Sequence, residues 1–478
     1  MLRLLACCLA IAAAQSAAAP SDWPRFGYDA GRSNASTAPT GIDAGNISAA
    51  VKQKVPLDGT VDASPIYLAN VTVHGEMYDV FFVTTTYGKT IAIDADDGSV
   101  LWEFTPSGYS SWAGSAQITN TTPAADADRQ NIYAASPDGR IQKLAVDDGH
   151  VVWSTPITML PQREKMDSPL NVLNGRVYAT TGGYSGDAPP YQGHIVILDA
   201  GSGQIQHVWN SLCSDRPGII DPNTCPQTRS AMWGRAGAVI DTATGNILVA
   251  TGNGRWDGRT SWGDAALELN PDATQLLGAY TPANTDALEA ADLDLGSTSP
   301  ALLDGDLIAQ GGKDGAIRLL SRQRMRGFAP GGEAQTVSTP SGDRLYTAPA
   351  VVRDGGVTTL FTADAGATAA WLLDRGAGGD SAGLLRQLWR VPNGGTSPVV
   401  AGGLLYVYSP AGALRVYDPG TGRLVTTLAC GSGHWNSPIV VDERIALPEG
   451  NANLRQTSGV LDIWRVTRRA HHGGPRVR

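Results

Sequence analysis

The sequence predicts an all-β protein: an eight-bladed β-propeller with four-stranded antiparallel blades, closed by a strand near the N-terminus. Three observations support this fold class. One kind of β-hairpin recurs along the chain, eight strands begin at similar short motifs, and one lone strand precedes the first of them. The 57 glycines and 29 prolines among 478 residues suit the many turns that such a fold requires.

The recurrent hairpin is an alternating apolar strand, an Asp or its equivalent, a tight turn with Gly, and a second alternating strand that often carries Trp. Alternation with period two on both sides of a Gly turn is typical of a β-hairpin. Self-similarity of this kind indicates a repeat architecture. Four clear copies occur at Ile91–Phe104, Gln142–Pro156, Val196–Asn210 and Leu414–Leu428.

Eight strand starts divide the chain. An interval of roughly 40 to 70 residues between starts suits blades of four short strands, so we expect eight blades. Seven starts are a small residue followed by Pro, and the eighth is Gly234–Asp241, in which Gly237 takes the place of proline. The seven are Ser64-Pro65, Thr122-Pro123, Ser168-Pro169, Ser299-Pro300, Ala348-Pro349, Ser397-Pro398 and Ser437-Pro438.

The strand at Ala49–Leu57 is expected to close the ring. The last blade ends near "LDIWRV" with little chain left for an outer strand, so the N-terminal strand should pair with the blade that contains Trp464. Such pairing removes the strand edge that an open ring would expose. No helix of three turns is expected after the first 19 residues.

The chain start has the features of a secretory signal peptide. One Arg precedes an apolar run from Leu4 to about Ala13, and small residues offer cleavage sites near Ala17–Ala19. The protein is therefore expected to be secreted or periplasmic. The expected segments are a signal peptide at 1–19, an N-terminal extension at 20–48, a single propeller at 49–466 and a disordered basic tail at 467–478.

Composition excludes some classes of partner. A net charge of −9 and a sequence pI near 5.3 argue against nucleic acid or an anionic membrane. No apolar run after the signal approaches the length of a membrane span. The histidines, His434 among them, show no metal-ligand spacing.

The cysteines predict one disulfide. Cys213 and Cys225 bracket the turn-rich loop "CSDRPGIIDPNTC", and in an oxidising compartment they should pair. Cys430 would then remain as a free, buried thiol. The alternative, free thiols at all three positions, requires a reducing compartment, which the signal peptide contradicts.

The repeat and the opening "DWPRFGYD" resemble the quinoprotein alcohol dehydrogenases, whose eight-bladed propellers hold pyrroloquinoline quinone (PQQ) and a Ca²⁺ or lanthanide ion. In that family a Trp shortly before a "TGN" step lies under the quinone, and Trp233 stands at that place. The asparagine of "TGN" ligates the metal, which implies this role for Asn253. Trp also packs blades, and Asn beside Gly is more often a turn residue, so position carries both assignments.

The stretch "DLDLGSTSP" matches the acidic step of the family. The resemblance implies that Asp292 is the catalytic base and that Asp294 is an extra lanthanide ligand. The two carboxylates are expected to share one face at the mouth of a strand, because side chains alternate along a strand. In "GGKDG" the resemblance implies that Lys313 contacts the quinone oxygens. Solvated loop carboxylates and an ordinary hairpin turn are the alternatives.

The chain departs from the family at two points. The adjacent cysteines that lie against the cofactor are absent from the mature chain. The glutamate ligand of the metal is replaced in "SGDAPPYQG", where Ala188 occupies its place and Asp187 stands one residue earlier. Asp187 is therefore a substitute metal ligand, or the site lacks one ligand.

Two functions follow from these observations. The first is a PQQ- and metal-dependent alcohol dehydrogenase that oxidises a small alcohol. Since no C-x-x-C-H motif occurs, we expect no haem, and electrons would pass to an external cytochrome or another acceptor. The second is a non-catalytic propeller that binds other proteins, like the outer-membrane assembly scaffolds of bacteria, which share the fold.

Overall fold

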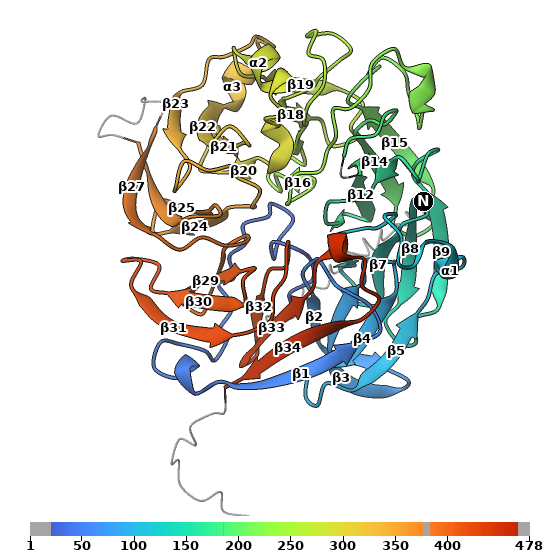
Figure 1. Cartoon of the computed structure of the whole chain (residues 1–478), viewed down its shortest axis with the longest axis vertical. Coiled ribbons are helices and arrows are strands. Elements are labelled where there is room, and N and C mark those ends of the chain that lie inside the picture. Colours follow the sequence, from blue (N-terminus) through green and yellow to red (C-terminus); the bar gives the residue numbers. More distant parts are fainter. Residues whose placement is uncertain (1–20, 185, 376–382, 467–478) are drawn as a thin grey trace, which may run out of the picture.

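The structure is a computed structural model that describes residues 21–184, 186–375 and 383–466. The predicted signal peptide (1–19) and basic tail (467–478) lie outside these residues. Eight four-stranded antiparallel sheets stand around one axis (Figure 1), which confirms the predicted fold class. The α-helices of the described residues have four to six residues: α1 (Tyr109–Trp112), α2 (Thr285–Ala290) and α3 (Arg322–Met325).

The blades follow one another in the sequence, each from an inner to an outer strand. Blades 1 to 4 are β2 (Ile66–Val73), β3 (Glu76–Thr84), β4 (Thr90–Asp94) and β5 (Val100–Phe104); β6 (Ala124–Ala125), β7 (Asn131–Ser136), β8 (Arg140–Ala145) and β9 (Val151–Pro156); β11 (Asn171–Leu173), β12 (Arg176–Thr180), β14 (His194–Asp199) and β15 (Ile205–Asn210); and β16 (Val239–Ile240), β17 (Ile247–Ala250), β18 (Ala266–Leu269) and β19 (Leu276–Tyr280).

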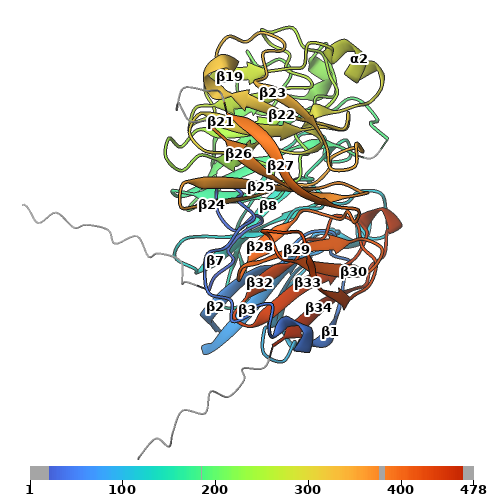
Figure 2. The same cartoon turned by 90° about the vertical axis from the view of Figure 1, so that its left-hand side faces the viewer.

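Blades 5 to 8 continue the ring. They are β20 (Ala301–Leu302), β21 (Leu307–Gly311), β22 (Ala316–Ser321) and β23 (Gln335–Ser338); β24 (Ala350–Asp354), β25 (Val357–Ala363), β26 (Thr368–Asp374) and β27 (Leu384–Val391); β28 (Val399–Ala401), β29 (Leu404–Ser409), β30 (Ala413–Tyr417) and β31 (Leu424–Ala429); and β32 (Ile439–Val441), β33 (Arg444–Glu449), β34 (Gly459–Arg465) and β1 (Val51–Leu57). A two-stranded pair, β10 (Glu164–Lys165) with β13 (Gly182–Gly183), stands apart from the blades. Blades 6 and 7 face the viewer in Figure 2.

All eight predicted strand starts lie one or two residues before an inner strand. Pro65, for example, precedes β2, and Gly237 shortly precedes β16. Proline is tolerated at this position because it has no N–H to donate, and the ladder of hydrogen bonds begins only with the residues that follow. Ring closure is also as predicted: β1 pairs antiparallel with β34, with Lys52 opposite Trp464, and Figure 1 shows the two strands side by side.

The hairpin motif explains how one blade is fixed to the next. Trp102, Trp153 and Trp389 lie on outer strands, and each donates its indole N–H to a carbonyl in the next blade. At all three junctions the Trp ring lies against a glycine at positive φ, where a side chain would collide with the ring: Gly149, Gly203 and Gly422. Gly is therefore required at these turns for conformation and for space.

The apolar core lies between neighbouring blades. One cluster joins blades 1 and 2 through Phe82, Trp102 and Ile132, and another joins blades 2 and 3. The largest cluster spans blades 7, 8 and 1, where the ring is closed. Among the described residues no helix has the length and apolar character of a membrane span.

The segment before β1 crosses one end of the ring. It forms hydrogen bonds with seven of the eight blades in turn, and dark blue marks its course through the middle of Figure 1. Arg32 is almost fully buried there and donates to the carbonyls of Phe26, Pro169 and Leu170. The contacts to the blades are Trp23 with Tyr67, Pro24 with Ala125, Arg25 with Asn171, Ala30 with Ile240, Ser33 with Val351, Ser36 with Val400, and Thr40 with Glu443.

Candidate functional site

A cavity of about 750 Å³ opens at the other end of the ring. Its lining comes largely from the turns that lead into the inner strands, because equivalent turns of all blades point towards one axis. In five blades the third residue before the strand-start proline lines the cavity: Asn120, Ser297, Tyr346, Gly395 and Trp435.

The residues predicted for the site meet in this cavity. Asn253 Nδ2 donates to Asp292 Oδ1 at 2.6 Å. Lys313 Nζ lies 2.7 Å from Asp294 Oδ2 and 3.4 Å from Asp292 Oδ2. The same ammonium group lies 5.2 Å from the ring centroid of Trp233. We call this group of five residues, which comes from blade 4, blade 5 and the turns that lead into them, the Asp292 wall.

Local structure explains how the wall assembles. Asn253 lies just after β17, and Lys313 lies in the turn between β21 and β22. A side chain at Gly252 would meet Trp233 Nε1 and the Asp294 carboxyl at about 3 Å, so Gly lets these groups approach. Asp294 Oδ1 also accepts the backbone N–H of Asn253 at 2.8 Å. Burial raises the pKa of Asp294, and the ion pair with Lys313 opposes that shift.

One prediction about this wall was wrong. Asp292 and Asp294 do not lie on a strand: they follow α2 and precede a 3-10 turn at Leu295–Ser297. Asp292 has φ 54°, in the left-handed region, so the backbone turns at this residue and does not continue as an extended strand. The carboxylates still converge, because both reach Lys313. Asp294 is buried, whereas the side chain of Asp292 is 57% exposed and lines the cavity.

Asp187 lines the same cavity but is bound differently. Its Oδ1 accepts the hydroxyl hydrogen of Tyr191 at 2.8 Å. Ala188, at the place where the family resemblance implies a glutamate, contributes no oxygen from its side chain. Asp187 therefore shares the cavity with the Asp292 wall, while its carboxylate is held by a neighbouring tyrosine.

The ligand set for a cation is partial. Asn253 Oδ1 is buried and accepts no hydrogen bond from any residue that the structure describes. A buried carbonyl oxygen without a donor is costly, and it suits a hard cation. Among the described ranges, no three His, Cys, Asp or Glu side chains are grouped so as to hold a metal by themselves. The fit to a cation thus depends on Asn253 and on the neighbouring carboxylates.

The opposite side of the cavity was missed by sequence reasoning. Asp62 Oδ2 lies 2.8 Å from His434 Nδ1, and its other oxygen accepts the N–H of Trp435 at 2.7 Å. We call Asp62, His434 and Trp435 the His434 wall. No spacing motif links Asp62 and His434, which are 372 residues apart. Inspecting the third residue before each strand-start proline would have found Asp62 and Trp435.

An aromatic row joins the two walls. The ring centroids of Trp233 and Tyr346 are 6.1 Å apart, those of Tyr346 and Trp435 are 5.5 Å apart, and those of Trp435 and His434 are 4.4 Å apart. All four rings line the cavity. Neighbouring rings are inclined by 44° to 59°, so the row offers several separate aromatic faces to a ligand.

Arg235 separates the cavity from the segment that crosses the other end. It lines the cavity, donates to the carbonyl of Trp435 at 2.9 Å, and lies 5.4 Å from the ring centroid of Phe26. Burial lowers its pKa to about 10, against the attraction of Asp62 and Asp167. The guanidinium remains charged at neutral pH.

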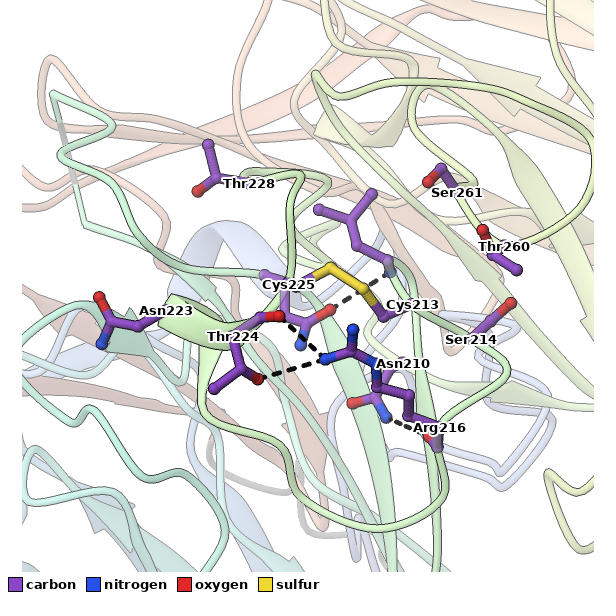
Figure 3. Close-up of a disulfide and its surroundings, with 12 residues drawn as sticks. Asn210, Cys213, Ser214, Arg216, Asn223, Thr224, Cys225, Thr228, Thr260 and Ser261 are labelled. Atoms are coloured by element: carbon purple, nitrogen blue, oxygen red, sulfur yellow. Dashed lines mark hydrogen bonds between the residues drawn. A yellow bond between two sulfur atoms is a disulfide. The ribbon is translucent and has the colours of Figure 1, made fainter.

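The predicted disulfide is confirmed: Cys213 and Cys225 are bonded (Figure 3). Within the loop, Arg216 donates to the carbonyl of Thr224 at 3.0 Å. The loop belongs to the connection between β15 and Trp233, so the disulfide restrains the chain that delivers this ring to the cavity. Cys430 is a free thiol, only partly buried, and burial raises its pKa to about 12.

Comparison with known proteins gives two kinds of similarity. The sequence family described as outer membrane protein assembly factor BamB matches residues 69–217. The quinohemoprotein alcohol dehydrogenase ADH-IIG of Pseudomonas putida is 26% identical over 188 residues, 39% of this chain and 24% of that protein. ADH IIB of the same organism is 23% identical over 318 residues, 59% of this chain and 43% of that protein. The matches therefore span less than half the length of these relatives.

Solved structures extend the likeness over most of the chain. Quinohemoprotein alcohol dehydrogenase from Comamonas testosteroni superposes with a TM-score of 0.66 at 17% identity, over 97% of this chain and 83% of that one. The europium-containing methanol dehydrogenase gives 0.68 at 15% identity, over 94% and 98%. The chain has the fold of the PQQ-dependent alcohol dehydrogenase-like propellers. BamB from Moraxella catarrhalis, with a TM-score of 0.53 at 12% identity over 88% and 100%, shares the architecture less closely.

Proposed function

We propose that this PQQ-type propeller is a PQQ- and metal-dependent alcohol dehydrogenase whose active site is the Asp292 wall. The observation that carries the proposal is the convergence of Trp233, Asn253, Asp292 and Lys313, which come from two blades and meet in one cavity. These are the positions that the family resemblance assigns to chemistry. The similarity to named alcohol and methanol dehydrogenases supports the same reaction class.

The residues present fit a flat, anionic cofactor with an associated cation. Trp233, at one end of the aromatic row, provides a surface for a planar ring system, and Lys313 supplies positive charge beside it. Asn253 Oδ1 is a free ligand oxygen, with Asp292 and Asp294 as its carboxylate neighbours. Asp187 is assigned as a further ligand, provided that it releases Tyr191.

Asp292 is the residue with access to a substrate proton. It is the more exposed of the two carboxylates, and it faces the cavity beside Lys313. A bound quinone with its cation supplies the acceptor for the hydride of the alcohol. Asp292 would accept the hydroxyl proton, Lys313 would stabilise negative charge on a bound quinone, and Asp294 holds Lys313 in place through their ion pair.

Export belongs to the same proposal. The predicted signal peptide and the Cys213–Cys225 disulfide both suit an oxidising compartment outside the cytoplasm. The two relatives from Pseudomonas putida are named quinohemoproteins, whereas this sequence has no C-x-x-C-H motif. We propose that electrons leave to a separate protein, such as a cytochrome.

A protein-binding scaffold is the second candidate. The match of residues 69–217 to the BamB family and the likeness to the BamB structure favour it. The missing cysteine pair, the alanine at position 188 and the bond between Asp187 and Tyr191 also point in this direction. On this alternative the cavity holds no redox cofactor.

Titration of the purified protein with PQQ, in the presence of Ca²⁺ or La³⁺, tests the proposal through the absorbance of the cofactor. We expect saturable, metal-dependent binding. Asn253→Ala should weaken it by removing a ligand oxygen, and Asp294→Ala should impair binding with La³⁺ more than with Ca²⁺. Asp354→Ala, at the exposed end of β24, is the control. If the wild-type protein bound no PQQ with either metal, the dehydrogenase proposal would be wrong and the scaffold would remain as the candidate function.

A further inference from the structure

The Asp62–His434 pair is built like an acid–base centre, although the proposed reaction does not use it. Asp62 is buried and also accepts the N–H of Ala452 at 2.9 Å. Burial opposes its ionisation, but the bonds from His434 and from two backbone N–H groups prevail and lower the pKa of Asp62. An ionised carboxylate only accepts hydrogen bonds, so Nδ1 of His434 must carry the proton.

The other imidazole nitrogen is left available to a ligand. With Nδ1 protonated, Nε2 of the neutral ring is an acceptor. No described residue donates a hydrogen bond to it, and His434 lines the cavity. The pair therefore presents an oriented acceptor whose tautomer is fixed by Asp62.

The surroundings of His434 suit an aromatic ring. Blade 7 lies between the blades that carry Tyr346 and Trp435, and its residues Gly395, Pro410 and Ala411 line the cavity there. Arg235 donates to the carbonyl of Trp435 and so holds the backbone of this residue next to His434. The carboxylate of Asp364, which lines the same part of the cavity, already accepts hydrogen bonds from the Ser341 hydroxyl and from backbone N–H groups.

We propose that the His434 wall and Tyr346 form a binding subsite for a hydroxylated aromatic ring. The ring packs between Tyr346 and Trp435, whose planes are inclined by 59°, and its hydroxyl donates to Nε2 of His434. Binding at this subsite requires no cofactor. It also names a substrate class for the oxidation, alcohols attached to a phenolic ring, and this second part rests on the proposed function.

Calorimetry on the disulfide-bonded, cofactor-free protein tests the subsite with three probes: 4-hydroxybenzyl alcohol, benzyl alcohol and ethanol. One additional hydrogen bond should make the phenolic ring bind about tenfold more tightly than benzyl alcohol. Ethanol should bind more weakly than either ring, because it cannot stack. Equal affinity for the two ring compounds would overturn the proposal.

Variants assign the preference to one atom. His434→Asn retains an N–H that can reach Asp62 but removes the Nε2 acceptor, so it should abolish the tenfold preference and leave the affinity for benzyl alcohol unchanged. His207→Asn, on the outer strand β15, is the matched control. Trp435→Leu should weaken both ring compounds. A preference that persists in folded His434→Asn would contradict the role of His434.

The subsite and the proposed oxidation fail in different ways. If the protein bound the ring compounds with the predicted preference but bound no PQQ, the proposed oxidation would be wrong and the proposed subsite would stand. If the protein bound PQQ but showed no preference for the phenolic ring, the proposed subsite would be wrong and the proposed oxidation would stand.

Discussion

The two ends of the ring are built from the same inner strands and differ in what is added to them. At one end, the segment that contains Arg32 crosses the blades and satisfies their backbone groups. At the other end, the turns remain open around a cavity with charged and aromatic side chains. Arg32 is 3% exposed and its two terminal nitrogens donate to carbonyls, whereas the side chain of Asp292 is 57% exposed and faces open space. The repeat sets the geometry of both ends, and the unrepeated residues decide that one end stabilises the fold and the other binds ligands.

The largest expected effect is on chemistry at the open end. Asp292→Asn keeps the shape of the side chain but removes proton acceptance, so dye-linked alcohol oxidation should fall about 10²- to 10⁴-fold. PQQ absorbance should show nearly unchanged cofactor binding, and the free energy of unfolding should change little, because the side chain is exposed. Asp354→Asn is the control. Full activity in Asp292→Asn would show that this carboxylate is not the base.

At the closed end the largest effect should be on stability. Arg32→Ala leaves the carbonyls of Phe26, Pro169 and Leu170 without a donor in a buried place. We expect a loss of about 3 to 4 kcal/mol in the free energy of unfolding, measured with denaturant. Arg344→Ala, at the exposed rim of the cavity, should change it by less than about 0.5 kcal/mol. Equal effects of the two variants would remove the contrast between the ends.

The ring could be predicted from sequence because its signals are local. Each strand start and each hairpin is encoded by a stretch of about fifteen residues or fewer. Trp102 and Gly149, which meet in the structure, belong to two copies of the same hairpin motif. The crossing segment gave no such signal. Trp23 and Arg32 act through contacts with distant blades, and their stretch of sequence has no apolar period from which those contacts could be derived.

The site could be predicted in part, for the same reason. Family resemblance located Trp233, Asn253 and Lys313, whose contacts are now visible, but their roles stay predictions. The expected strand face failed at Asp292, because helix α2 and a residue at positive φ replace the strand there. The Asp62–His434 pair was missed because its partners come from the first and last blades, which meet only when the ring closes.

A third variant tests how the open end is held. Cys213→Ser with Cys225→Ser opens the loop before Trp233, and a loop of this size should cost about 2 to 3 kcal/mol. Counting thiols on unreduced wild-type protein should find one free cysteine, Cys430. If the disulfide mainly positions Trp233, PQQ affinity should fall in the variant at temperatures where the protein remains folded. Unchanged affinity would limit the disulfide to a role in stability.

The smallest expected effect is a difference between the two ends in how their contribution to stability depends on pH. The folded-state pKa of Asp62 lies below the ordinary value of 3.8, so the stability that Asp62 contributes is present above about pH 4 and is lost as the pH falls towards the folded-state value.

Asp62→Asn should therefore cost about 2 kcal/mol at pH 7, because it removes a charged acceptor of three N–H groups, and the difference from wild type should shrink below pH 4. Burial lowers the pKa of Arg32 to about 9, so Arg32 remains protonated at pH 7 and below, and the cost of Arg32→Ala should stay constant over the same range. Denaturant unfolding of both variants between pH 3 and 7 measures the two trends. A cost of Asp62→Asn that does not change with pH would show that its carboxylate is not held ionised by His434 and the backbone.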